Sequence, residues 1–78
     1  MKVKLKGVKR VSITGEHIKL DSLMKLASLV STGGEAKMLI QNGEVYVDGE
    51  RCMMRGKKIK PGDTVRYGGN TLLVRQAT

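Results

Sequence analysis

The spacing of apolar residues changes twice along this chain of 78 residues, and these changes restrict the folds that it can adopt. Charged and apolar residues alternate from Lys2 to Lys6, and the alternation returns at Val11 to Ile13, as in half-buried strands. From Leu20 to Val30 the apolar residues recur every three or four positions, which predicts a short amphipathic helix. Strand-like patterns follow over residues 45–52 and 64–75. We therefore expect a small α+β domain in which two short helices pack on one antiparallel sheet of about four to five strands.

Cap and turn residues indicate where these elements begin and end. Thr32 and Glu35 have the spacing of a capping box, so the Thr32 hydroxyl can accept a hydrogen bond from the Glu35 amide while the Glu35 side chain reaches back. This box predicts the start of a second helix. Asp48-Gly49 predicts a tight hairpin turn between two strands. Pro61-Gly62 has the residues that a type II turn prefers, and it precedes the next expected strand.

The chain carries a formal net charge of +8, from 15 Lys and Arg against 7 Asp and Glu. The charge is +4 over residues 1–17, −2 over residues 18–50 and +6 over residues 51–78. The middle segment, which contains both expected helices, is therefore not the source of the basicity, and a basic amphipathic helix that binds membranes is disfavoured. So strong a positive charge in so small a domain predicts a polyanionic partner, bound by strands and loops.

Several functional classes are disfavoured by the residue content. No uninterrupted apolar run exceeds three residues, so we expect no transmembrane span, no signal peptide and a cytoplasmic location. Cys52 is the single cysteine and His17 the single histidine, so we expect neither an internal disulfide nor a metal site. No catalytic Ser/His/Asp arrangement or phosphate-binding loop motif is recognisable, so we predict a protein that is not an enzyme and needs no cofactor. The methionines within or beside the apolar stripes are assigned to the core: Met24, Met38, Met53 and Met54.

The run from Ile18 to Val65 resembles the S-four RNA-binding domain, also called the alpha-L motif and named for the fourth protein of the small ribosomal subunit. The family pattern opens with a basic residue, Leu and Asp, and passes through a short helix to Ser-Arg-x-x-Ala-Arg. It continues with Ile, Gly-x-Val-x-Val-Asn-Gly and a basic stretch, and closes with Pro-Gly-Asp-x-Val. In this chain Gly33 stands where the family usually has Arg, and Asp48 replaces Asn. The matching positions are Lys19-Leu20-Asp21, Thr32, Ala36-Lys37, Ile40, Gly43, Val45, Val47-Asp48-Gly49, Lys57-Lys58-Ile59 and Pro61-Gly62-Asp63-Thr64-Val65.

The resemblance implies RNA contacts at the start of the second helix, over Thr32 to Lys37. The glycine pair at positions 33 and 34 is similar to the short stand-alone bacterial branch of the family, whose members are associated with ribosomal RNA or ribosome assembly. We therefore expect an RNA-binding domain over residues 11–78 and a basic N-terminal strand or extension over residues 1–10. Protection of a sheet edge and solubility explain the N-terminal cations as well as contact with RNA does: Lys2, Lys4, Lys6, Lys9 and Arg10.

Two segments supply the candidate RNA-binding residues. At the start of the second helix, bare amides and the helix dipole favour a phosphate, although the capping residues can satisfy those amides themselves. Residues 51–60 hold five cations and no acid, which is typical of a phosphate-binding surface or of a solvated loop. No catalytic or metal-binding residue is predicted. The candidates are Lys19, Thr32, Gly33, Gly34, Lys37, Arg51, Arg55, Lys57, Lys58 and Lys60.

The aromatic residues of the chain are Tyr46 and Tyr67, so stacking of bases on a sheet is mostly unavailable. We therefore predict recognition of structured RNA, ribosomal RNA in particular, through its backbone phosphates. Transfer RNA and DNA remain alternatives, as does a protein-interaction module of ubiquitin-like size. The expected partners are RNA and the ribosome or its assembly intermediates, with no membrane and no small-molecule substrate, and the expected state is a monomer.

Overall fold

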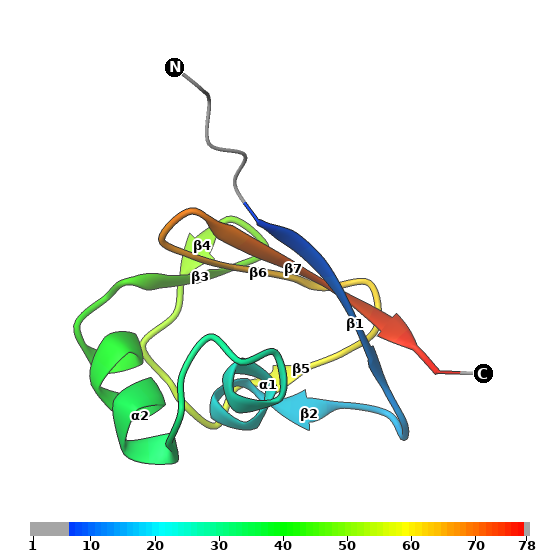
Figure 1. The fold of residues 1–78 in the computed structure, drawn as a ribbon, viewed down its shortest axis with the longest axis horizontal. Helices are drawn as coiled ribbons and strands as arrows, with labels where there is room; N and C mark the ends of the chain where they lie inside the picture. The colour runs from blue at the N-terminus through cyan, green and yellow to red at the C-terminus, as the bar shows by residue number, and fades with distance from the viewer. Residues whose placement is uncertain (1–6, 78) are drawn as a thin grey trace.

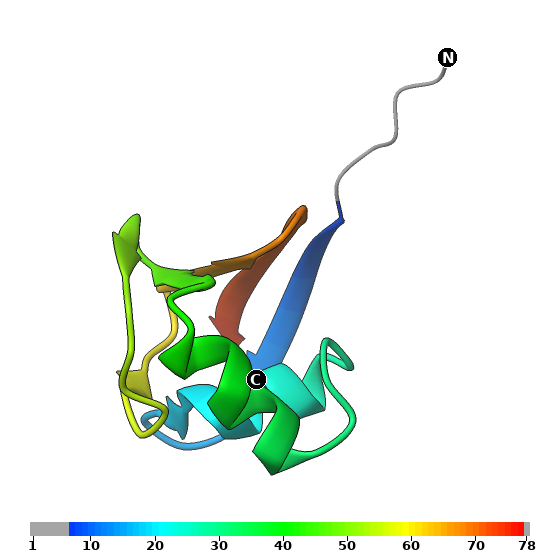
Figure 2. The same cartoon turned by 90° about the vertical axis from the view of Figure 1, so that its left-hand side faces the viewer.

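The structure, a computed structural model that describes residues 7–77, contains one five-stranded sheet, one two-stranded ribbon and two helices. The strand order in the large sheet is β1-β7-β6-β3-β4, and β2 and β5 form the ribbon. Both helices lie on the same side of the large sheet (Figure 1, Figure 2). The elements are β1 (Val8–Ile13), β2 (Ile18–Lys19), α1 (Leu20–Leu26), α2 (Gly33–Gln41), β3 (Val45–Val47), β4 (Glu50–Arg51), β5 (Lys58–Ile59), β6 (Thr64–Tyr67) and β7 (Asn70–Gln76).

The prediction of two helices on one sheet is confirmed, but one strand pairing differs from the expected antiparallel arrangement. The pairs β3–β4, β3–β6 and β6–β7 are antiparallel, whereas β1 pairs parallel with β7, with Val8 beside Thr71. The sheet is therefore mixed. The segment from β2 to β6 forms one long connection between the parallel strands β1 and β7. The alternation at Val11 to Ile13 belongs to β1, and the strand expected at Lys2 to Lys6 lies outside the described residues.

The core lies between the helices and the inner face of the large sheet. Leu20, Leu23 and Met24 of α1 and Ala36 and Ile40 of α2 have no exposed surface. Their spacing of three or four residues is the helical periodicity expected from the sequence. The strands contribute alternate residues, as half-buried strands do: Val11, Ile13, Val45, Val47, Val65, Leu72 and Val74.

The assignment of the methionines to the core is right for Met24 and wrong for the other three. Met38 is 61% exposed on the outer side of α2, and Met53 and Met54 are 56% and 65% exposed. Met53 and Met54 lie in the irregular segment after β4, where no helix or strand period indicates which side chains face inward. Cys52, which precedes them, is half-buried.

The expected turns position the ends of the strands. Asp48 and Gly49 both have positive φ angles, of 51° and 88°, which a two-residue hairpin turn requires. The Asp48 carboxylate also accepts a hydrogen bond from the amide of Thr64 at 2.9 Å, which ties the hairpin to the start of β6. Gly62 has a φ of 100° in the turn before β6, as the third residue of a type II turn does.

Candidate nucleic-acid interface

The segment between β4 and β5 folds back onto the start of α1. The amide of Leu20 donates to the carbonyl of Lys57 at 2.9 Å, and the amide of Asp21 donates to the carbonyl of Arg55 at 3.1 Å. The first amides of a helix have no partner within the helix, so the loop supplies acceptors that α1 lacks. These bonds fix the loop backbone, and therefore the origins of its basic side chains, against α1.

The β2–β5 ribbon places Lys19 beside the same loop. Lys19 lies directly opposite Lys58, and Ile18 lies opposite Ile59. Ile59 has no exposed surface, so the alternate pair of lysines faces solvent. Two ammonium groups in opposite positions repel one another, and an anion bound between them would relieve that repulsion. We call these two lysines, together with Arg55 and Lys57, the basic cluster: Lys19, Arg55, Lys57 and Lys58.

The start of α2 is partly capped and partly open. The Thr32 hydroxyl accepts from the amide of Glu35 at 3.1 Å, as the predicted capping box requires. The Glu35 carboxylate reaches back to the amide of Ser31, at 2.9 Å, one residue before the N-cap. The amides of Gly33 and Gly34 have no acceptor among the described residues. A Cβ placed on Gly33 would meet no atom within 4 Å. Two donors at the positive end of the helix dipole are therefore accessible to an anion.

The basic cluster and the open start of α2 lie at the same end of the molecule. In Figure 1 and Figure 2, the loop before β5, the start of α1 and the start of α2 all lie in the lower half, away from the turn between β6 and β7. Lys37 is exposed and lies one turn further along α2. This end therefore carries most of the predicted residues: Lys19, Thr32, Gly33, Gly34, Lys37, Arg55, Lys57 and Lys58.

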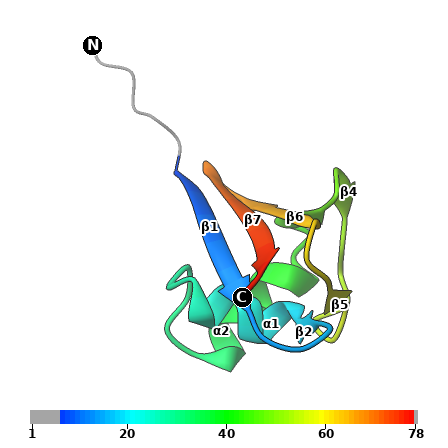
Figure 3. The same ribbon diagram turned by 90° about the vertical axis from the view of Figure 1, so that its right-hand side faces the viewer.

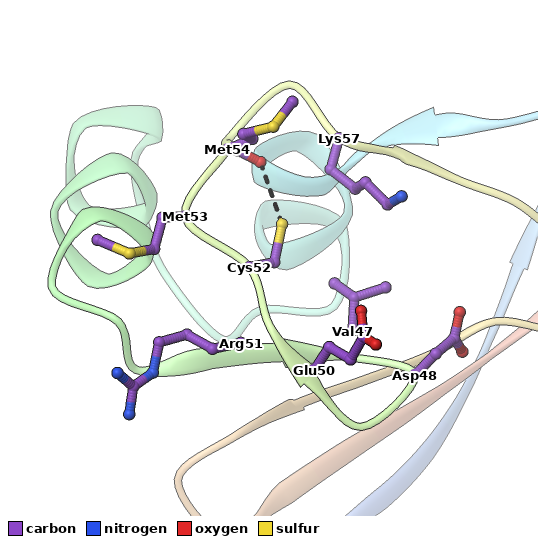
Figure 4. Close-up of a pocket in the computed structure, with 8 residues that line it drawn as sticks. All are labelled: Val47, Asp48, Glu50, Arg51, Cys52, Met53, Met54 and Lys57. Atoms are coloured by element: carbon purple, nitrogen blue, oxygen red, sulfur yellow. Dashed lines mark hydrogen bonds between the residues drawn. The ribbon is translucent and has the colours of Figure 1, made fainter.

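Arg51 does not join the basic cluster, whereas Lys60 stands two residues after Lys58. Arg51 pairs with Tyr46 across β4 and β3, and its guanidinium donates to the Tyr46 hydroxyl at 3.2 Å. Figure 4 shows the side chains of Arg51 and Lys57 on opposite sides of a pocket, pointing away from one another. Lys60 follows β5 in the turn that leads to β6. Arg51 is therefore separated in space from Lys57, although the two cations are close in sequence.

The pocket beside β4 has a volume of about 260 Å³ and is lined by residues of mixed character, with carboxylates, cations and methionines (Figure 4). The Cys52 thiol within it donates to the backbone carbonyl of Met54 at 3.6 Å, so its partner is not a general base. Within residues 7–77, no three His, Cys, Asp or Glu side chains are grouped to hold a metal ion. The same range contains no helix with the length and apolar character needed to cross a membrane.

The sequence reasoning missed two parts of this surface chemistry. One is the backbone: the carbonyls of Arg55 and Lys57 cap α1. The signal for it is Lys19, because a helix that begins after a lysine has no side-chain acceptor of its own and needs one from elsewhere. The other is a second group of cations on the sheet, Arg10, Arg66 and Arg75, which the alternation of their strands places on one face.

Two proteins of known sequence are similar to this chain over most of their length. It is 39% identical over 59 residues to "Probable ribosome maturation protein RlbA" of Bacillus subtilis (strain 168), a match that covers 76% of this chain and 83% of that protein. It is 36% identical over 58 residues to "Putative RNA-binding protein YbcJ" of Escherichia coli (strain K12), which covers 74% of this chain and 83% of that protein.

Structural and family comparisons agree with these similarities. Heat Shock Protein 15 of Vibrio cholerae has the same fold, with a TM-score of 0.68 and 19% identity over 81% of this chain and 67% of that chain. The S4 domain model matches residues 11–75, which include both helices and all five strands of the large sheet except the start of β1 and the last residue of β7. By this match and the two similar sequences, the chain belongs to the S4 domain family, the S-four family that its motifs resemble.

Proposed function

We propose that this protein binds structured RNA without catalysing a reaction, and that it takes part in ribosome maturation. The observation that carries the proposal is the joining of the basic cluster to the start of α1, through two backbone hydrogen bonds and the β2–β5 ribbon. The names of RlbA and YbcJ support ribosome maturation and RNA binding respectively. The ribosomal connection also supports the expected cytoplasmic location.

The basic cluster and the start of α2 bind the phosphates of the RNA. Lys19 and Lys58 hold one phosphate between their ammonium groups, and the amides of Gly33 and Gly34 donate to another. Arg55 and Lys57 add charge beside them, and each contact releases counterions from the RNA. Because Gly33 replaces the usual Arg of the family, one bidentate phosphate contact is absent and the loop cations carry more of the affinity.

Charge reversal of the loop tests the surface. Lys57→Glu with Lys58→Glu weakens binding to ribosomal RNA by about tenfold or more, because two attractive contacts become repulsive. Lys25→Glu, a single charge reversal on the exposed side of α1, is the control and has a much smaller effect than either Lys57→Glu or Lys58→Glu alone. Filter binding measures both, and thermal melting checks that each variant is folded. Unchanged binding by the folded double variant would show that another surface binds the RNA.

Crosslinking in cells, followed by sequencing of the bound nucleic acid, tests the ligand. Enrichment of ribosomal RNA supports the proposal, whereas enrichment of transfer RNA or DNA contradicts it. Helix α2 carries one cation, Lys37, whereas a helix that reads the major groove of DNA has a face with several cations. Depletion of the protein tests the role in ribosome maturation. Ribosome assembly intermediates should then accumulate.

A further inference from the structure

The large sheet has one face that no described element covers. The helices and the β2–β5 ribbon lie on the inner side, where the core is, and Figure 1 and Figure 3 show no described element on the outer side. The side chains on this open sheet face are those that alternate with the buried residues of each strand. They include Arg10 of β1, Tyr46 of β3, Arg51 of β4, Arg66 of β6, and Leu73 and Arg75 of β7.

The charge of the open sheet face has one sign. Four arginines lie on it, and none of the described strand residues that face outward is acidic. The acids nearest in sequence to Tyr46 are Glu44 and Asp48, which lie in the turns on either side of β3. A surface of this kind attracts an anionic ligand, and guanidinium groups bind phosphates in a bidentate manner.

An aromatic ring lies among these arginines. Tyr46 pairs with Arg51 on one neighbouring strand and with Arg66 on the other. The guanidinium carbons of Arg51 and Arg66 lie 5.7 Å and 5.9 Å from the centre of the Tyr46 ring. Arg51 is also fixed by its hydrogen bond to the Tyr46 hydroxyl, at 3.2 Å. Tyr46 and two guanidinium groups are therefore close neighbours, and a base can stack against these flat groups while its phosphates meet the arginines.

We infer that the open sheet face is a second RNA-binding surface, which takes an unpaired segment of the RNA whose folded part is held by the basic cluster. That the ligand is RNA rests on the proposed function. The ligand is unpaired because a base in a duplex cannot present its face to Tyr46. From β4 to β1 the sheet is about 19 Å wide, four strand spacings, which gives room for a few nucleotides.

Two labelled RNAs separate the two surfaces in a fluorescence anisotropy titration of the full chain. One is a ten-nucleotide oligouridine, which is unpaired, and the other is a blunt RNA hairpin. Tyr46→Leu and Arg66→Glu each weaken oligouridine binding by about tenfold and change hairpin binding by less than about twofold. Tyr46→Phe retains the ring and therefore most of the affinity. Arg10→Glu, on the edge strand, is a second charge reversal on the same face.

Lys25→Glu is the control, because it makes the same change of charge on α1, and it leaves oligouridine binding within about twofold. Equal weakening by Lys25→Glu and Arg66→Glu would overturn the inference, as would equal loss of affinity for both RNAs in the sheet variants. Binding of a ten-residue polyglutamate peptide with no binding of oligouridine would also overturn it and assign the face to an acidic protein. Lys57→Glu with Lys58→Glu tests the proposed function separately, because that surface is judged on the hairpin alone.

Discussion

Gly33 occupies the position at which the family usually carries Arg, and the structure shows space for that side chain. A Cβ there meets no atom within 4 Å, and the φ of Gly33 is not positive. We expect Gly33→Arg to fold normally and to bind RNA about fivefold more tightly, because a bidentate phosphate contact is restored. Gly33→Ala is the control for helix propensity alone: it stabilises the protein by about 0.5–1 kcal/mol. Anisotropy and thermal melting measure the two effects, and weaker binding by Gly33→Arg would contradict the phosphate site.

Thr32 contributes to stability through a single hydrogen bond to the amide of Glu35. Replacing Thr32 by Ala removes this cap and destabilises the protein by about 1 kcal/mol, which lowers the melting temperature by roughly 4–8 °C. Thr32→Ser keeps the hydroxyl and changes the melting temperature little. If the Ala and Ser variants melted together, the cap would contribute nothing.

At the scale of single residues, the residue type alone does not determine whether a side chain is exposed to solvent. The buried Met24 recurs in a helical period, but Met53 and Met54 follow β4 in irregular backbone, where nothing local predicts a direction. The neighbours of Arg51 in sequence predict that it belongs to the basic loop. Its place in the strand ladder instead directs it to Tyr46, because directly paired residues share a face of a sheet.

Among the elements, the β3–β4 hairpin depends on Asp48. This residue has a φ of 51°, and its carboxylate accepts from the amide of Thr64. Asp48→Ala loses that hydrogen bond and keeps the unfavourable backbone, so we expect destabilisation of about 1–3 kcal/mol. Asp48→Asn, which restores the usual residue of the family, tolerates this conformation, keeps an acceptor and stays within about 0.5 kcal/mol of the original. Urea denaturation compares them, and equal midpoints would exclude a role for the bond.

The elements themselves were largely predictable because their signals are local. The apolar spacing indicated α1, the capping box located the start of α2 at Thr32, and Asp48-Gly49 located the hairpin. The parallel pairing of β1 with β7 was not predictable, because nothing in either strand encodes the direction of a partner so distant in the chain. For the same reason the sequence could not show that a distant loop caps α1.

For the whole molecule, the net charge of +8 predicts a strong dependence of RNA affinity on salt. In the proposed function, the basic cluster and the start of α2 together neutralise roughly four to six phosphates. The logarithm of the affinity for ribosomal RNA should therefore fall against the logarithm of salt concentration with a slope of about −3 to −5. A filter-binding series from low to high salt measures the slope, and a value near zero would exclude a phosphate-based mechanism.

The parallel pairing of β1 and β7 also determines how the domain resists a mechanical load. Val8 begins β1 at one end of the sheet, and Gln76 ends β7 at the other, beside Ile13. A force that draws Val8 and Gln76 apart therefore acts along both strands and loads all of their paired residues in shear, so that they must break together. The same force on an antiparallel hairpin would open its pairs one at a time, like a zipper. Because β1 is an outer strand of the sheet, this shear contact is the first barrier to stretching the chain.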